Sequence, residues 1–218
     1  QDIPPYEVAT QVWFDQRLKG NYEIPNTPEL SLILKKGKPP VVTVRVDQSK
    51  EVEFVYVFYT QHGQVDGGKN DMTNTKNRFW HHAPIKLGKG KSAAHLHLPS
   101  VDKPLWVYVN VRYKLEKPIS GAGYYYGSYT TNSFNLSSLM KTVTVAELKK
   151  AGIVPTLKPS LRIEDFKGDW KKEWFTYKVE KWGIKTHKLY ASTWVAPDGA
   201  KLFFEVRSPM ANKMTVGI

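Results

Sequence analysis

The stretch LWVYVNVRY, residues 105–113, decides the fold class of this chain. Valines at every second position give it the period of two that a β-strand burying one face requires. Four earlier runs are also rich in β-branched and aromatic residues, at 30–34, 41–46, 52–59 and 93–98, and Gly, Pro, Asn and Asp clusters separate them. Five strands at this spacing predict an all-β domain over residues 27–116, an immunoglobulin- or fibronectin-like sandwich.

The region before this domain predicts one short helix. Apolar residues recur at helical spacing over residues 6–19, and Gly20 provides a C-terminal stop. The prolines that follow favour an extended connector, because a residue preceding proline is pushed out of the helical region. Residues 1–26 are therefore expected as a helix and a connector.

The region after residue 116 predicts an ordered Tyr- and Leu-rich connector over 117–160, followed by a second β-region over 161–218. The connector includes a short helix at 144–150, with Thr144 as cap, Glu147 in the capping-box position and Gly152 as stop. Further strands are expected at 161–166, 175–179, 188–194 and 201–207, and the last residues read as part of another. These strands make half a sandwich, which predicts pairing with the first domain or further strands beyond residue 218.

Composition excludes several classes of function. The 218 residues contain no cysteine, which removes disulfides, thiolate nucleophiles and Cys-ligated metals. No apolar run approaches the roughly 20 residues needed to span a bilayer. The first five residues lack the basic and apolar regions of a signal peptide. The formal net charge of +12 indicates a basic protein suited to anionic partners.

Catalytic motifs are absent from the sequence. It has no G-x-S-x-G elbow, no P-loop, no G-x-G-x-x-G and no H-E-x-x-H. Glu164 and Asp165 are adjacent in a predicted strand and would point to opposite faces, which makes them a poor glycosidase pair. No catalytic residue is therefore assigned.

Metal binding has two weak candidates. Two imidazoles spaced two apart on one strand can share a zinc ion, but no third ligand is evident. The histidines concerned are His81, His82, His95 and His97. A structural calcium ion near Glu164, or in the loop with Asp66, Asn70 and Asp71, matches no loop signature. The sequence therefore predicts no cofactor and leaves structural calcium as an alternative.

The strongest local feature is the segment Gly168–Lys188, where three Trp and one Tyr are interleaved with six Lys and three acidic residues. Flat aromatic rings stack on sugar rings, and lysine attracts carboxylate, sulfate or phosphate. The competing interpretation is that the tryptophans belong to a core. The candidate ligand-binding residues are Trp170, Trp174, Tyr177, Trp182, Lys185 and His187, with Tyr124, Tyr125 and Tyr126 as a second patch. Nucleic acid ranks lower, because arginine is scarce and no recognition helix is predicted.

A resemblance to a known family supports a carbohydrate-related interpretation. The segments 12–20 and 25–30 resemble the last helix and connector of secreted bacterial α/β-hydrolases of the dienelactone-hydrolase and acetylxylan-esterase-like type. The segments 77–80, 104–113 and 121–127 resemble the accessory sandwich of planctomycete-type homologues. The motifs at 163–166, 169–170 and 194–197 are similar to the opening of jelly-roll carbohydrate-binding modules.

The resemblance implies a non-catalytic, carbohydrate-binding accessory region of a secreted serine esterase that acts on polysaccharide. The catalytic residues would then lie upstream of Gln1, and the second β-domain would be incomplete. The expected partners are an upstream hydrolase domain and a polysaccharide, with acidic glycans favoured by the charge; the expected location is extracytoplasmic. Two alternatives stay open: an assembly module that pairs β-strands with another chain, and a metal-dependent enzyme that uses the histidines.

Overall fold

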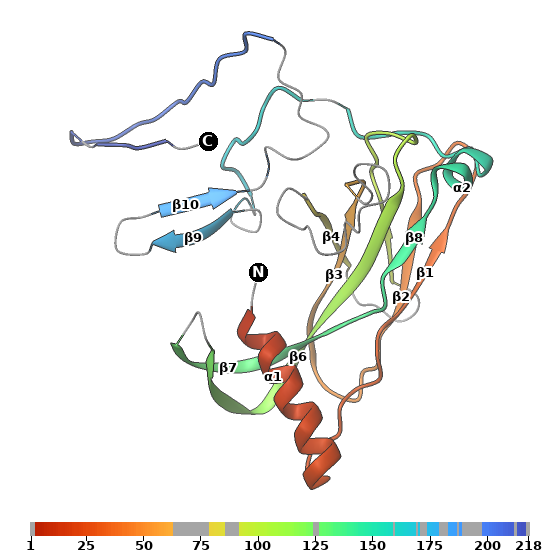
Figure 1. Ribbon diagram of the computed structural model, residues 1–218, viewed down its shortest axis with the longest axis vertical. Coiled ribbons are helices and arrows are strands. Elements are labelled where there is room, and N and C mark those ends of the chain that lie inside the picture. The colour runs from red at the N-terminus through yellow and green to blue at the C-terminus, as the bar shows by residue number, and fades with distance from the viewer. Residues whose placement is uncertain are drawn as a thin grey trace, which may run out of the picture.

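The computed structural model describes residues 3–62, 79–85, 92–123, 127–158, 160–168, 170, 174–178, 183–186, 188, 198–211 and 213–216 (Figure 1). The chain is mainly β, as the alternating runs predict, and has two antiparallel sheets that share one core and a helix at its N-terminal end.

The first sheet contains three antiparallel strands in the order β1 (Glu29–Ile33), β2 (Val41–Arg45) and β5 (Ser92–His95). All three were predicted, within one to three residues at each end. In β2 the buried valines Val42 and Val44 alternate with more accessible neighbours, so one face of this sheet points into the core.

The second sheet has a four-strand path in the order β4 (His81–Ile85), β3 (Val52–Thr60), β6 (Leu105–Gly123) and β7 (Gly127–Ser137), and β8 (Lys141–Val143) pairs with β6. The sequence predicted β3 and the first half of β6. The strands β4, β7 and β8 were not predicted: β7 and β8 are mostly polar, and β4 is a short stretch, HHAPI, without alternation of apolar residues.

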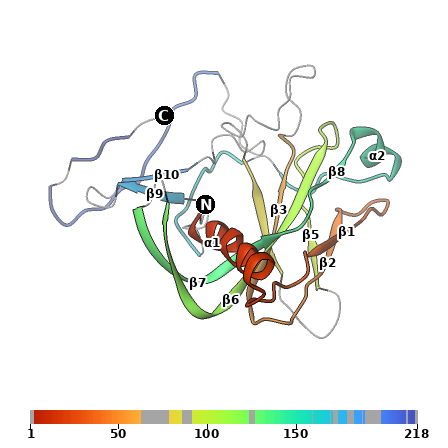
Figure 2. The same ribbon diagram turned by 60° about the horizontal axis from the view of Figure 1, so that its bottom comes forward.

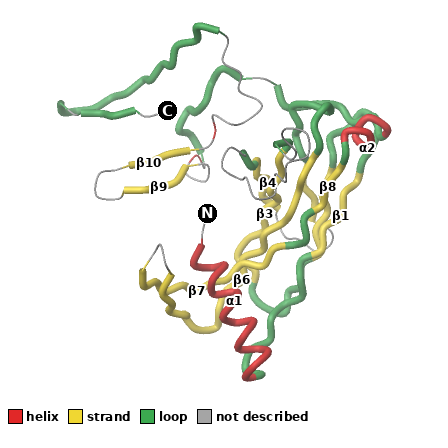
Figure 3. The backbone as a smooth tube through the Cα atoms, viewed as in Figure 1, coloured by secondary structure: helices red, strands yellow, loops and turns green. Residues whose placement is uncertain are grey.

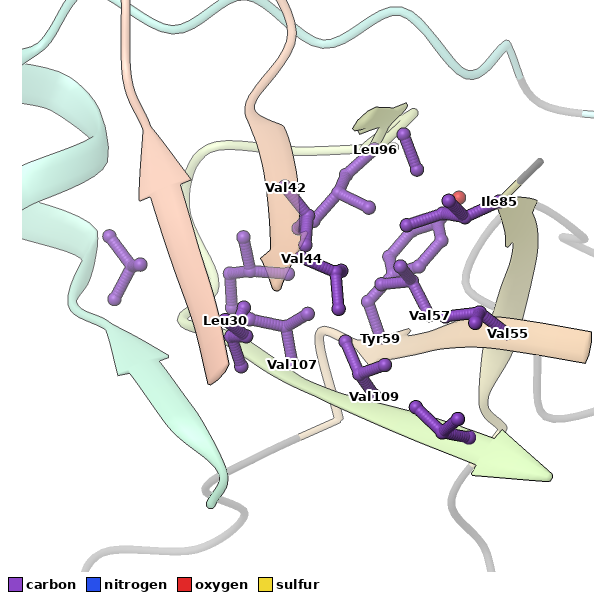
Figure 4. Close-up of a cluster of buried hydrophobic side chains, with 14 of the residues drawn as sticks. Leu30, Val42, Val44, Val55, Val57, Tyr59, Ile85, Leu96, Val107 and Val109 are labelled. Carbon is purple, nitrogen blue, oxygen red and sulfur yellow. The ribbon is translucent and has the colours of Figure 1, made fainter. Parts of the chain in front are cut away.

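The core lies between the two sheets, and Figure 4 shows side chains from both of them meeting there. Val42 and Val44 of the first sheet face the second sheet, whose Val57 and Val109 are fully buried. Side chains on alternate positions of β3 and β6 enter this core, so the intervening positions face outward.

The strand β6 crosses the boundary expected between residues 116 and 117. Its first half pairs with β3, and its second half continues past an irregularity between Lys114 and Ile119 as a long hairpin with β7. The stretch expected as a connector therefore supplies strands to the second sheet. The Tyr-rich tip at 124–126 lies outside the described residues.

The N-terminal helix α1 (Ile3–Phe14) packs against this hairpin, and Figure 2 shows it inside the curve of β6 and β7. A π-helical turn, η1 (Asp15–Lys19), extends it to Gly20, whose left-handed conformation confirms the predicted stop. The buried side of the helix is narrower than expected. Val8 and Val12 are buried, whereas Leu18 is 77% exposed.

The predicted capped helix is confirmed as α2 (Val145–Lys150). The Thr144 hydroxyl accepts a hydrogen bond from the Glu147 backbone N–H at 3.2 Å, and the Glu147 carboxylate accepts one from the Thr144 N–H at 2.7 Å. Leu148 anchors the helix in the core with no exposed surface. Gly152 follows with a positive φ of 64°, as its role of stop requires.

The C-terminal region differs from its prediction. Its described residues contain one two-stranded sheet, β9 (Trp174–Lys178) and β10 (Gly183–Thr186). The strand β9 matches the one predicted at 175–179 within one residue, and all of the strand predicted at 188–194 except its first residue lies outside the described residues. Residues 161–166 and 201–207 were predicted as strands and are not strands. The first segment turns around Glu164, and the second is extended without pairing to a described strand, as the loop colouring of Figure 3 shows.

Candidate functional site

The described part of the Gly168–Lys188 segment is organised around one carboxylate. The Glu164 side chain is only 8% exposed. It accepts hydrogen bonds from the Trp174 indole Nε1–H at 2.7 Å and from the Lys188 ammonium at 2.8 Å. The backbone N–H groups of Asp165 and Phe166 also donate to it, at 2.9 and 3.0 Å. Glu164 therefore joins a loop, β9 and the segment after β10.

Three aromatic rings gather beside this carboxylate. The Phe166 ring lies 5.2 Å from that of Trp170 and 5.4 Å from that of Trp174, and the two indoles are 6.3 Å apart in an edge-to-face arrangement. Phe166 has a φ of 54°, uncommon for a residue with a bulky side chain. We call the group of Glu164, Phe166, Trp170, Trp174 and Lys188 the Glu164 cluster.

The electrostatics of this cluster favour binding over proton transfer. Burial by itself raises the pKa of Glu164, but the hydrogen bonds from Lys188, Trp174 and the two backbone N–H groups outweigh burial and lower this pKa to about 2. The carboxylate is therefore ionised at neutral pH and is a poor general acid. Its geometry supports a structural role that fixes the indoles and one cation.

The outward side of the cluster combines apolar and cationic groups. Phe166 is 52% exposed, whereas Trp170 and Trp174 are half-buried. Lys167 is exposed next to Phe166. Lys185 is also exposed, but it lies opposite Phe175 and therefore on the other face of the hairpin from Trp174. A ligand approaching Phe166 thus meets an aromatic surface with an exposed lysine next to it in sequence.

The predicted site residues are brought together only in part. Trp170 and Trp174 meet in the Glu164 cluster, and Lys185 lies on the neighbouring strand. Tyr177 is placed in β9 by its backbone alone. The remaining predicted residues fall outside the described residues: Trp182, His187, Tyr124, Tyr125 and Tyr126.

Sequence reasoning missed the two residues that define the cluster. Glu164 was considered as half of a catalytic pair and as a calcium ligand, and Phe166 as the end of a strand and of the 163–166 motif, but neither was among the candidate ligand-binding residues. A carboxylate ten residues before a tryptophan gives no local pattern, because the bond between them depends on a turn that brings them together. Their place in a lysine- and tryptophan-rich stretch was the available signal.

The four candidate histidines do not form a metal site. His81 and His82 are neighbours on β4 and point to opposite faces of its sheet, opposite Tyr59 and Phe58 respectively. His97 instead shares a 3.0 Å hydrogen bond with the Thr156 hydroxyl. Within the described ranges, no group of three or more His, Asp or Glu side chains is placed to hold a metal ion. The metal-enzyme alternative therefore gains no ligand set from them.

A shallow depression of about 480 Å³ lies over the far end of the β6–β7 hairpin. The Ser120 and Thr130 hydroxyls share a hydrogen bond of 2.7 Å there. The lining residues are Ser120, Gly121, Ala122, Ser128, Tyr129 and Thr130. Tyr129 is the one titratable group among them, and burial raises its pKa, followed by its contact with Glu7. The depression offers hydroxyl groups for hydrogen bonding but no acid–base pair.

Comparison with protein-family models, curated proteins and solved structures finds no match to this chain. None of its described helices is both long and apolar enough to cross a bilayer.

Proposed function

We propose that this chain is a non-catalytic, carbohydrate-binding accessory region of an extracytoplasmic hydrolase of the esterase type, acting on polysaccharide and favouring acidic glycans. The Glu164 cluster is the observation that carries this proposal. It joins a 52%-exposed phenylalanine to two half-buried indoles beside the exposed Lys167, and its carboxylate is already engaged by four donors. Such a surface attracts an anionic ligand through its lysine and stacks its aromatic rings on the sugar rings, without performing chemistry on the ligand.

The charge distribution supports the preference for acidic glycans. The net charge is +12, and residues 117–218 contribute +8 of it. Three exposed described cations lie in or near the cluster's segment: Arg162, Lys167 and Lys185. A polysaccharide carrying carboxylates or sulfates would therefore be attracted to the same region that offers aromatic rings.

We also propose that the two facing sheets form a fibronectin-like sandwich. The strand orders β1-β2-β5 and β4-β3-β6-β7 support this assignment, because they place consecutive hairpins and crossovers as in that class of sandwich. The jelly-roll-like continuation stays a prediction, since the described C-terminal region contains only the β9–β10 pair.

Affinity electrophoresis tests the function. We expect the chain to be retarded in gels containing polygalacturonate, and less so in gels containing its methyl ester. The variant Trp170→Ala should lose most of this retardation. The matched control Trp13→Ala removes a 46%-exposed indole on α1 and should leave the retardation unchanged. Wild-type migration unaffected by either polysaccharide at low salt would refute the proposal.

One observation favours the assembly alternative as a second candidate. The extended residues 201–207 expose large apolar side chains, with Phe203 87% and Val206 61% exposed. Exposed apolar residues on an extended segment suit strand pairing with another chain. A concentration-dependent oligomer in gel filtration that Phe203→Asp abolishes would support this function; a monomer at all concentrations would exclude it.

A further inference from the structure

A second aromatic surface covers the outward face of the second sheet. The positions of β3 that alternate with its core valines carry Phe54, Tyr56 and Phe58. The sheet-face patch, as we define it, consists of Phe54, Tyr56, Phe58, Trp80, His82 and Tyr108. Each of its side chains is half-buried.

The rings of the patch are in continuous contact across three strands. Phe58 lies opposite both His82 of β4 and Tyr108 of β6, and its ring stacks on that of Tyr108 at a centroid distance of 5.4 Å. Tyr56 contacts the His82 ring at 6.0 Å, and Trp80 meets Tyr108 edge-on at 5.1 Å. The sheet itself therefore holds the rings in fixed positions.

Polar groups border the patch on the β6 and β7 side. Asn110 lies opposite Tyr56, accepts a hydrogen bond from the Ser137 hydroxyl at 2.6 Å and donates one to the Tyr6 hydroxyl of α1. Burial raises the pKa of Tyr108, and the neighbouring Tyr6 raises it further, so both hydroxyls stay neutral at physiological pH. Asn110 is only 7% exposed, and these two hydrogen bonds engage its amide, so the border joins α1, β6 and β7 and leaves the rings and Arg112 to meet a ligand.

Arg112 gives the end of the patch a positioned positive charge. Its guanidinium lies 4.6 Å above the Phe54 ring, and its Nε donates to the Asn135 side-chain oxygen at 3.0 Å. Lys114 lies two residues further along the same face of β6, but its ammonium pairs with Glu51 at 3.1 Å, whereas Arg112 contacts a ring of the patch. A planar, preorganised guanidinium suits a carboxylate or sulfate group.

The dimensions of the patch favour a narrow ligand over a protein partner. Phe54 to Phe58 spans about 13 Å along the strand, and β4 to β6 spans about 10 Å across the sheet. The resulting footprint is on the order of 130 Å², far below the roughly 800 Å² per partner that a stable protein interface buries. A short stretch of a sugar chain fits this footprint, with the C–H faces of its rings against the aromatic side chains.

We propose that the sheet-face patch is a second glycan-binding site, which holds a segment of an anionic polysaccharide with an acidic group paired to Arg112. The site rests on the proposed carbohydrate-binding function but is separate from the Glu164 cluster: it belongs to β3, β4 and β6 and shares no residue with the cluster.

Isothermal titration of the whole chain with oligogalacturonate, and with its methyl ester, tests this site. The variants are made in the Trp170→Ala chain, so that binding at the Glu164 cluster does not mask the second site. There, Arg112→Gln should weaken the remaining binding of the acidic oligosaccharide about tenfold and leave binding of the ester nearly unchanged, because the ester carries no charge for the guanidinium to pair with. Phe58→Ala should weaken both ligands by a similar factor. Trp13→Ala and Lys150→Gln are the controls for a lost indole and a lost surface charge, and both should bind as the Trp170→Ala chain does.

The outcomes separate this site from the proposed function. Loss of all binding in Trp170→Ala, or remaining binding that neither Arg112→Gln nor Phe58→Ala weakens, would overturn the second site and leave the function standing. If the wild-type chain binds neither sugar, both the second site and the proposed function are overturned. If the chain binds oligothymidylate more tightly than oligogalacturonate, and Arg112→Gln and Phe58→Ala abolish that binding, the patch is a nucleic-acid surface and the glycan site is overturned. Arg112→Lys keeps the positive charge but lacks the planar guanidinium. If this variant has the circular dichroism spectrum of wild type and an affinity between those of the Trp170→Ala chain and Arg112→Gln, the result supports the site even where Phe58→Ala fails to fold.

Discussion

Acidification should destabilise the fold through His81, whose half-buried ring lies on the core-facing side of the second sheet. The ring stacks on Tyr59 at 5.1 Å and meets Phe79 edge-on at 4.9 Å. Burial lowers the pKa of His81 first, and the neighbouring His62 and His82 lower it further, to about 4. An unfolded chain restores this pKa to its ordinary value of 6.5.

The sign of the effect follows from proton binding. Between pH 6.5 and pH 4 the unfolded chain holds a proton on His81 that the folded chain does not, so the free energy of unfolding falls as the pH falls. One unit of pKa corresponds to about 1.4 kcal/mol, so the full window is worth about 3 kcal/mol, and less where the ring keeps partial solvation. The contribution is fully present above pH 6.5.

Chemical denaturation between pH 7.5 and pH 4.5 measures this effect. The stabilising contributions of Asp47 and Glu164, whose pKa values are lowered to about 2, begin to decrease near the ordinary pKa values of 3.8 and 4.5, so most of each contribution persists down to pH 4.5. The variant His81→Phe keeps an aromatic ring and cannot titrate, so its stability should fall about 2 to 3 kcal/mol less than wild type over the range. His95→Gln, at an exposed position, should follow wild type. Parallel curves for wild type and His81→Phe would refute the reasoning.

Three further predictions concern stability, each measured by urea denaturation at pH 7.5. Leu96→Ala, at a fully buried position, should lower the free energy of unfolding by about 2 to 5 kcal/mol, whereas Leu139→Ala, at an 84%-exposed one, should change it little; equal effects would contradict the assigned core. Thr144→Ala removes the cap of α2 and should lower stability by about 1 kcal/mol; an unchanged midpoint would show that the cap is dispensable. The buried Tyr22 hydroxyl has no hydrogen-bond partner within the described part of the chain, so Tyr22→Phe should leave the free energy of unfolding unchanged or raise it by up to about 1 kcal/mol. Tyr113→Phe loses the 3.0 Å hydrogen bond to the Asp47 carbonyl and should lower the free energy of unfolding. The reverse order would refute this account.

Local patterns were sufficient for much of the first domain. The alternating valines of β2, β3 and β6 predicted strands because burial on one face imposes a period of two. The cap at Thr144 and the stop at Gly20 were predictable for the same kind of reason, since each depends on residues within one helical turn. No such pattern marks β7, where only the pairing with β6 makes a strand of a mostly polar stretch.

The two aromatic surfaces show where local information ends. Sequence alone placed Trp170 and Trp174 in a lysine-rich stretch and indicated a binding face, but it predicted a strand where the chain turns around Glu164. The sheet-face patch draws its rings from β3, β4, β6 and the residue before β4, which are distant in sequence and adjacent only through strand pairing. Residue types and their alternation thus determined that this chain forms strands with aromatic faces, because burial acts on each segment separately. The register between strands, and the turn around Glu164, decided which rings share a surface, because those contacts form only when the strands have paired and the two sheets have packed together.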